Sequence, residues 1–323
     1  MKRMSSLLTA ILLVIGLLAG CGAEPTTSDS DKSESSNTGQ AEQDNFPVTI
    51  KDALDHEVTI NEKPERIVSL IPSNTEIAYD LGLSEEIVGV SDFDNYPEEV
   101  NEKEKVGGQE INVEKILSLN PDLILAHESG AQVASEALKQ LRDSGINVII
   151  VNETANFEEV YATIKMIGKA TGQNEEAAKT IESMKEQLEG IQEKVAQVEE
   201  QKSVFIEVSP EPEIYTPGKN TFMNEMLALI NAKNVSADID GWAKIDQESV
   251  IQKNPDVIIT TYGYYSENPK KQVLEREGWS NVKAVKNENV YDVHSDLVTR
   301  SGPRLVEGVE ELAKAVYPEV FGE

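Results

Sequence analysis

Two stretches of the chain, 112–128 and 246–262, are near copies of each other. The first reads NVEKILSLNPDLILAHE and the second reads DQESVIQKNPDVIITTY. Identical residues align at a constant separation of 134 positions, among them Glu114 with Glu248, Pro121 with Pro255, and Asp122 with Asp256. Because both copies should form the same local structure, the chain is predicted to contain two similar lobes.

Each copy has the pattern of a helix, a turn and a strand. Asn112 or Asp246 can cap a helix, and the glutamate that follows suits the positive end of the helix dipole. Asn-Pro-Asp then ends the helix, because proline cannot continue it. The apolar runs 123–126 and 257–260 are typical of buried strands in a parallel sheet. Ligands bind beyond the carboxyl ends of such strands, so the residues after both runs are candidates for a shared cleft.

Outside the repeat, strand-like and helix-like segments alternate, which predicts an α/β fold with parallel-type sheets in both lobes. Residues 157–201 break this rhythm, because they are helical throughout except at Thr171-Gly172. The piece from Asn174 to about Gln201 would span on the order of 40 Å, enough to pass between lobes, although a plain surface helix is the alternative. The predicted organisation is an N-terminal lobe at 46–156, a helical linker at 157–201 with the long bridging helix, and a C-terminal lobe at 202–323.

The N-terminus has the layout of a secretory signal peptide over residues 1–20. Two basic residues precede an apolar stretch that is too short to span a bilayer. Leu18-Ala19-Gly20-Cys21 resembles the bacterial lipobox, which implies a diacylglycerol anchor on Cys21; an ordinary signal peptide with a chance cysteine is the alternative. Cys21 is the only cysteine, so no disulfide can form within the chain. Residues 21–45 are polar and are predicted to form a disordered tether behind the lipidated cysteine.

Charge and motifs exclude several classes of function. The net charge of −29 argues against nucleic acid as a partner, since phosphates require a basic surface. An acidic surface suits either solubility or docking to a basic partner. No GxSxG, P-loop or HExxH motif is present, so an extracellular hydrolase has no positive support. Three histidines are too few to favour a bare zinc or manganese site, and no catalytic residue, cofactor or resident metal is predicted.

Several segments in order resemble the substrate-binding proteins of ABC importers for cobalamin, ferric siderophores and haem. They are IVSLIPSNTEIAYDLGL, the two Asn-Pro-Asp-strand units, the long helix, TPGKNTFMNEMLALINAKN and SGPRLVEGVEELA. The resemblance implies two α/β lobes bridged by one long helix, with a small-molecule ligand held between them. It further implies a monomer that is not an enzyme, lipid-anchored on the extracellular face of a Gram-positive cell membrane, which delivers its ligand to an ABC permease.

The resemblance also assigns a docking role to the two glutamates of the repeat. In the family an acidic residue on top of each lobe meets arginines of the permease, and the corresponding positions are Glu114 and Glu248. Their alternative role is that of helix-start carboxylates, each stabilised by the helix dipole by about 0.3–1 kcal/mol. Docking is favoured, because helix-start chemistry does not require the two lobes to correspond.

Nine residues near predicted strand ends or loops are candidates for the ligand site. They are Phe93, Tyr96, Gln109, His127, Tyr215, Trp242, Tyr262, Asp296 and Leu297. In the cobalamin-binding proteins, aromatic residues at positions like Phe93, Tyr215 and Trp242 pack against the corrin ring, and such rings supply contact area at low entropic cost. Core packing is the alternative for any single ring. The sequence departs from that pattern at Gln109 and Leu297, where the family often carries an aromatic residue, so cobalamin is favoured over its rivals rather than fixed.

Haem and ferric siderophores are the nearest rival ligands. His127 and His294 could each end a strand at the cleft, and imidazole is a ligand for haem iron or cobalt. A strand-end histidine is more often a polar cap. Siderophores that carry negative charge would require converging basic groups, of which Arg300 and Arg304 are the available ones.

Overall fold

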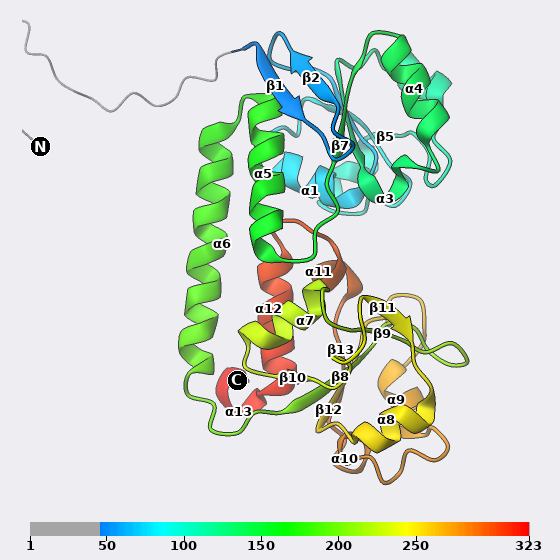
Figure 1. The fold of residues 1–323 in the computed structure, drawn as a ribbon, viewed down its shortest axis with the longest axis vertical. Helices are drawn as coiled ribbons and strands as arrows, with labels where there is room; N and C mark the ends of the chain where they lie inside the picture. Colours follow the sequence, from blue (N-terminus) through cyan, green and yellow to red (C-terminus); the bar gives the residue numbers. More distant parts are fainter. Residues whose placement is uncertain (1–45, 323) are drawn as a thin grey trace, which may run out of the picture. The chain divides into compact units, whose positions relative to one another are not determined.

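The computed structural model describes residues 46–322. The predicted signal peptide, the lipidated Cys21 and the tether lie outside the described residues. Within 46–322, no helix is long and apolar enough to cross a membrane. The described chain opens with an antiparallel hairpin of β1 (Val48–Lys51) and β2 (Glu57–Ile60). The two lobes follow, one above the other in Figure 1.

The first lobe is built on a five-stranded parallel sheet in the order β5-β4-β3-β6-β7. Its strands are β3 (Ile67–Ser69), β4 (Ile87–Val90), β5 (Glu104–Lys105), β6 (Leu123–His127) and β7 (Asn147–Val151). Its helices are α1 (Pro72–Asp80), the 3-10 helix η1 (Glu98–Glu102), α2 (Val113–Ser118), α3 (Glu128–Ala131) and α4 (Ser135–Asp143). In β6, Leu123 and Leu125 pack into one hydrophobic cluster and Ile124 and Ala126 into another. The apolar run is therefore unbroken because both faces of the strand are covered.

The second lobe contains a four-stranded parallel sheet in the order β10-β8-β12-β13. These strands are β8 (Ser203–Glu207), β10 (Lys233–Asn234), β12 (Val257–Thr260) and β13 (Val290–Asp292). A separate antiparallel pair joins β9 (Tyr215–Pro217) to β11 (Trp242–Lys244). The accompanying helices are α7 (Phe222–Leu229), α8 (Gln247–Lys253), α9 (Pro269–Leu274), α10 (Lys283–Lys286) and α11 (Ser295–Thr299). The prediction of two α/β lobes with parallel sheets is confirmed.

The repeated Asn-Pro-Asp turn has the same backbone geometry and the same role in both lobes. Asn120 and Asn254 adopt left-handed backbone conformations, with φ of 47° and 46°, which asparagine tolerates better than most residues. Asp122 accepts a hydrogen bond of 2.8 Å from a backbone N–H two residues before β3, and Asp256 accepts one of 2.9 Å from the first N–H of β8. The aspartate of the motif thus fastens the start of the neighbouring parallel strand in each lobe.

A layer of helices along the left of Figure 1 joins the lobes. It contains α5 (Phe157–Thr171), α6 (Asn174–Val195), α12 (Leu305–Val316) and α13 (Pro318–Phe321). The buried residues of α6 recur every three or four positions from Ala177 to Val195, so one stripe faces the core. This stripe packs against α5 of the first lobe and against α12 and α13, which follow the second lobe in the chain. The predicted bridging helix is confirmed, although it ends at Val195 rather than near Gln201.

Candidate ligand-binding cleft

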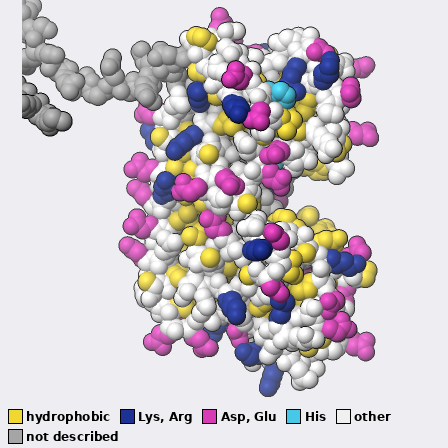
Figure 2. All heavy atoms as spheres, viewed as in Figure 1, with side chains coloured by type: hydrophobic (Ala, Val, Ile, Leu, Met, Phe, Trp, Pro, Cys, Tyr) yellow, Lys and Arg dark blue, Asp and Glu magenta, His cyan; other side chains and the backbone are white. Residues whose placement is uncertain are grey.

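A cavity of about 850 Å³ lies between the two lobes. Its first-lobe wall comes from the segments that follow β3, β4, β6 and β7, and its second-lobe wall comes from segments 220–222 and 294–301 together with Trp242 and Tyr264. Figure 2 shows the surface hollowed at this level, on the right between the upper and lower lobes. The carboxyl ends of the first-lobe strands therefore meet the second lobe across the cleft, as expected for parallel sheets.

Phe93 and Trp242 line the cleft from opposite lobes and are 56% and 48% exposed. Phe93 lies on the loop after β4, which is fixed by the buried Asp94: its carboxylate accepts from the Ser91 N–H at 2.8 Å and from the Ser91 hydroxyl at 2.5 Å. Burial raises the pKa of Asp94, although these hydrogen bonds oppose the shift. Trp242 begins β11 and lies opposite Pro217 of β9. Two large exposed rings on facing walls are typical of a site for a bulky apolar ligand.

Tyr262 does not reach the cleft, contrary to the prediction. It is fully buried, and its hydroxyl donates a hydrogen bond of 2.6 Å to Glu207. Arg276 donates two further bonds of 2.7 Å to the same carboxylate. Burial raises the pKa of the Tyr262 hydroxyl, and the Glu207 charge acts in the same direction. Tyr264 lines the cleft instead and is 67% exposed.

Gln109 lies beside the cleft rather than in its main volume. It lines a side cavity of about 340 Å³ that shares Phe93 and His127 with the cleft. The other walls of this cavity are mostly apolar, with Val133 and Leu138 among them. The loop that carries Gln109 therefore contributes to a chamber that adjoins the main cleft.

Three more predicted residues line neither of these two cavities. Tyr215 lies on β9 opposite Lys244, two positions along the strands from the pair of Trp242 and Pro217, and outside the cleft wall. Tyr96 packs under the guanidinium of Arg304, with 3.7 Å between the guanidinium carbon and the ring centre. Leu297 is half-buried in α11. The sequence indicated which segments lie near the cleft, but it could not indicate whether these three side chains point into it.

His127 and His294 both line the cleft. Each is the N-cap residue of a short helix, His127 of α3 and His294 of α11. Nδ1 of His127 accepts from the Ser129 N–H at 3.2 Å, and Nδ1 of His294 accepts from the Asp296 N–H at 3.2 Å. Burial lowers the pKa of His127, although nearby Glu153, Glu128 and the Asn152 backbone oppose the shift. The lowered pKa favours the neutral form of the ring at pH 7.

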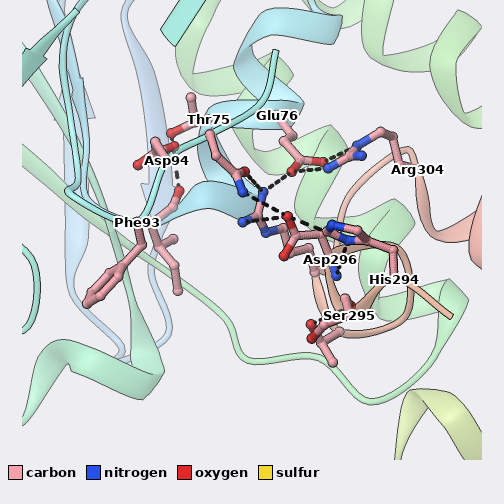
Figure 3. Close-up of polar contacts among 12 residues, drawn as sticks. Thr75, Glu76, Phe93, Asp94, His294, Ser295, Asp296 and Arg304 are labelled. Carbon is pink, nitrogen blue, oxygen red and sulfur yellow. Dashed lines mark hydrogen bonds and ion pairs between the residues drawn. The ribbon is translucent and has the colours of Figure 1, made fainter. Parts of the chain in front are cut away.

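A network of buried ion pairs joins the lobes at one end of the cleft (Figure 3). Glu76 of α1 binds Arg300 at 2.8 Å and Arg304 through two bonds of 2.9 and 2.7 Å. Arg300 also binds Asp296 at 3.0 Å and Asn95 at 2.7 Å. The Glu76 side chain is only 2% exposed. The predicted ligand residue Asp296 thus lines the cleft while it is held by this network.

The cleft wall contains more acidic than basic groups. Glu153, Glu159 and Asp296 are its carboxylates, and among the residues that line it Arg300 is the single Lys or Arg. That guanidinium is already bound by Glu76 and Asp296. The cleft consequently offers no uncommitted cation among its described lining residues to a ligand with negative charge.

Several lining residues were not predicted from the sequence, among them Asn95, Tyr264 and the segment 153–155. The segment 153–155 follows β7 directly, so the strand-end argument applied to β6 would have identified it. Asn95 could not have been identified in this way, because its role depends on Arg300 of the other lobe.

Glu114 and Glu248 occupy the second residue of α2 and of α8. Asn112 and Asp246 cap these helices, accepting from Lys115 and Ser249. Both glutamates are exposed, and neither forms an ion pair with any residue between 46 and 322. They are therefore equivalent and accessible in the two lobes.

The described residues contain no cluster of three or more His, Cys, Asp or Glu side chains that could hold a metal ion. Fold and cleft together are those of a solute-binding protein of two α/β lobes. Residues 67–297 match the family described as periplasmic binding protein, and the chain belongs to that family. It is a substrate-binding protein of an ABC transporter, which binds a small molecule and works with a permease, and members of the family are not enzymes.

Known proteins resemble the chain at both sequence and structure level. The chain is 51% identical to the uncharacterized ABC transporter substrate-binding lipoprotein YvrC of Bacillus subtilis, and the match covers 100% of both chains. The structure of a possible iron-binding (periplasmic solute-binding) protein from Staphylococcus epidermidis superposes with a TM-score of 0.74 at 40% identity, covering 79% of this chain and 100% of that one. The vitamin B12 binding protein BtuF of Vibrio cholerae superposes with a TM-score of 0.65 at 28% identity, covering 79% and 97%.

Proposed function

We propose that the protein captures cobalamin or a related corrinoid and delivers it to an ABC importer permease. The observation that carries this proposal is the cleft itself: Phe93 and Trp242 expose large rings from opposite walls, and the one guanidinium among its described lining residues is already paired. A bulky ligand without excess negative charge suits such a site. The likeness to the vitamin B12 binding protein of Vibrio cholerae supports the same ligand class.

Haem or a ferric siderophore is the second candidate ligand. The likeness to the Staphylococcus epidermidis protein, described as possibly iron-binding, favours it. The charges of the cleft act against it, because Glu153 and Glu159 would lie near the carboxylates of haem or of an acidic siderophore without a free cation to compensate.

Delivery would use Glu114 and Glu248 as the contacts with the permease, one on each lobe. Both are exposed and without an ion-pair partner among residues 46–322, as a docking carboxylate should be. The lipobox at Cys21 and the name of the Bacillus subtilis relative support attachment to the outer face of the cell membrane after removal of residues 1–20. We also propose that the N-terminal lobe ends at residue 156 and that the helical linker ends at residue 201.

Calorimetric titration of the purified full chain tests the ligand. Cyanocobalamin, cobinamide, haem and several ferric siderophores are compared at one pH and salt concentration. We expect the two corrinoids to bind. In a separate unfolding measurement, a corrinoid at 100 times its dissociation constant should raise the unfolding free energy by about 2.7 kcal/mol. Binding of haem or a siderophore alone would transfer the proposal to the second candidate.

Uptake assays test docking separately from ligand binding. Glu114→Arg together with Glu248→Arg should abolish uptake and leave calorimetric affinity unchanged. Glu136→Arg is the matched control, because Glu136 is also an exposed carboxylate in the first turn of a helix but is not one of the repeated glutamates. Normal uptake by the double variant would refute the docking role.

A further inference from the structure

The two cleft histidines share one feature of geometry that determines which ring nitrogen carries the proton. In each, Nδ1 lies 3.2 Å from a backbone N–H that points at it, that of Ser129 for His127 and that of Asp296 for His294. A backbone N–H can only donate, so Nδ1 must present its lone pair. In a neutral imidazole the single proton then resides on Nε2.

The remaining neighbours of Nδ1 are consistent with this tautomer. The Ser129 hydroxyl lies 2.8 Å from Nδ1 of His127 and can donate a second hydrogen bond to it. The Asp296 carboxylate lies 3.9 Å from Nδ1 of His294, beyond hydrogen-bond distance, and is held by Arg300 and Asn95. The Ser129 hydroxyl can donate or accept, whereas the backbone N–H can only donate, so the N–H decides the tautomer at each Nδ1.

Metal-binding histidines normally have the opposite arrangement. Their second nitrogen donates its N–H to a carboxylate or a carbonyl, which leaves a lone pair for the metal on the ligating nitrogen. In this cleft the second nitrogen accepts instead, so ligation through Nε2 would require the proton to move to Nδ1 and would break the helix cap. We propose that His127 and His294 donate Nε2–H hydrogen bonds to oxygen acceptors on the rim of the ligand, and do not occupy an axial position of its metal.

Two unpaired polar atoms support this assignment independently. Nε2 of His127 is buried and makes no hydrogen bond of normal geometry in the described part of the chain, although the Asn152 backbone lies near enough to the ring to raise its pKa. Thr154 Oγ1 likewise has no hydrogen-bond partner among the described residues, and Thr154 is only 7% exposed where it lines the cleft. The two residues lie at the ends of neighbouring strands: His127 is the last residue of β6 and pairs with Val151, the last residue of β7, and Thr154 follows β7. Two such atoms in one wall suit a ligand with oxygen atoms there, because an acceptor would satisfy the Nε2–H and either a donor or an acceptor would satisfy the Thr154 hydroxyl.

The proposal rests on the proposed function, and it identifies a chemical feature of the ligand. The amide oxygens at the edge of a corrinoid are acceptors of the required kind, and its metal keeps the axial groups with which it arrives. The wall around His127 and Thr154 then selects ligands by their rim, whereas Phe93 and Trp242 contact their flat faces.

Nuclear magnetic resonance of the full chain with ¹⁵N-labelled histidine tests the tautomer without any ligand. Long-range nitrogen–proton correlations distinguish a proton on Nε2 from one on Nδ1, and we expect the Nε2–H pattern for His127 and His294 at neutral pH. His56 serves as the internal reference, because it lies in the N-terminal hairpin and its Nδ1 faces the Asp52 carboxylate at 3.1 Å. An Nδ1–H pattern at His127 would overturn the assignment.

Absorbance spectroscopy and one set of variants test the role in binding. Aquocobalamin should keep its visible bands when it binds, whereas replacement of its water by imidazole would shift them. His127→Phe should weaken cyanocobalamin binding by about five- to tenfold, the value of one hydrogen bond to an otherwise unpaired group. His56→Phe should leave the affinity unchanged.

The outcomes separate this inference from the proposed function. A band shift that disappears in His127→Phe or His294→Phe would show axial ligation and overturn the inference while the corrinoid proposal survives. Equal affinity of His127→Phe and the unchanged chain would overturn the donor role. Failure of every corrinoid to bind would refute the proposed function, and the resonance experiment would still decide the tautomer.

Discussion

Replacement of Glu76 by glutamine tests whether the ion-pair network fixes the two lobes. Glu76 belongs to the first lobe, and its side chain is 2% exposed where it meets Arg300 and Arg304, whose side chains are 13% and 16% exposed. Glutamine keeps the shape but removes the charge. Arg300 would retain Asp296 at 3.0 Å, whereas Arg304 would lose its only ion-pair partner among the described residues.

The expected loss is large because one guanidinium becomes a nearly buried charge without a partner. Breaking a buried pair from one side costs about 3–5 kcal/mol of unfolding free energy. For a chain of this size that corresponds to a fall of roughly 10 °C in the melting temperature. Removal of an exposed pair costs less than about 1 kcal/mol.

Thermal and denaturant unfolding followed by circular dichroism measure this difference. Asp143→Asn is the matched control, because it removes the Lys139–Asp143 pair, whose side chains are 67% and 64% exposed. Glu76→Met combined with Arg304→Met should recover much of the loss, since neither partner is left charged and buried. If Glu76→Gln unfolds like Asp143→Asn, the network does not stabilise the junction and the reasoning is wrong.

Three further predictions follow from individual contacts. Phe93→Ala and Trp242→Ala should each weaken corrinoid binding by about 2 kcal/mol, roughly 30-fold by calorimetry. Tyr265→Ala is the control and should not weaken binding, because Tyr265 is as exposed as Phe93, at 56%, but lies outside the cleft. Burial lowers the pKa of His127 below 6.5, so as the pH falls the unfolded chain binds a proton at this residue before the folded chain does. The unfolding free energy should therefore fall as the pH drops through 6.5 toward the folded pKa. His127→Gln should remove that component from melting temperatures measured over a series of pH values. Burial opposes ionisation of Asp256, but hydrogen bonds from Ser203 and the charge of Lys283 lower its pKa overall. The ionised carboxylate therefore stabilises the folded protein at neutral pH, and acid removes this stabilisation. Asp256→Asn should destabilise the protein near neutral pH and reduce its sensitivity to acid below pH 3.8.

Features set by local sequence were predictable. The runs 123–126 and 257–260 form strands because no polar residue interrupts them, and both faces of each strand are covered. The bridging helix was placed correctly at its start, Asn174. Its end was predicted near Gln201 rather than at Val195, because the polar residues after Val195 are also good helix formers. The chain turns there so that it can enter β8 at Ser203.

Side-chain direction depends on partners far away in the sequence, and this limited the prediction of the site. Tyr262 is predicted to line the cleft because it follows a strand, whereas Tyr264 is not among the predicted residues. The structure turns Tyr262 inward because Glu207, 55 positions earlier, accepts its hydroxyl proton in a hydrogen bond. The Glu76 network has the same character, since its arginines lie 224 and 228 positions later. No local pattern indicates either partnership.

The duplicated units are alike at one end and different at the other, and this difference bears on the ligand. Their Asn-Pro-Asp turns are identical because each aspartate fastens the start of a neighbouring strand, a task that both lobes require. At the opposite end of the strand the copies diverge, with His127 aligned to Thr261 of the second copy. His127 lines the cleft, whereas Thr261 is 3% exposed and does not. The first lobe therefore contributes a cleft residue from the end of its repeat, whereas the second lobe contributes its cleft histidine, His294, from a segment outside the repeat.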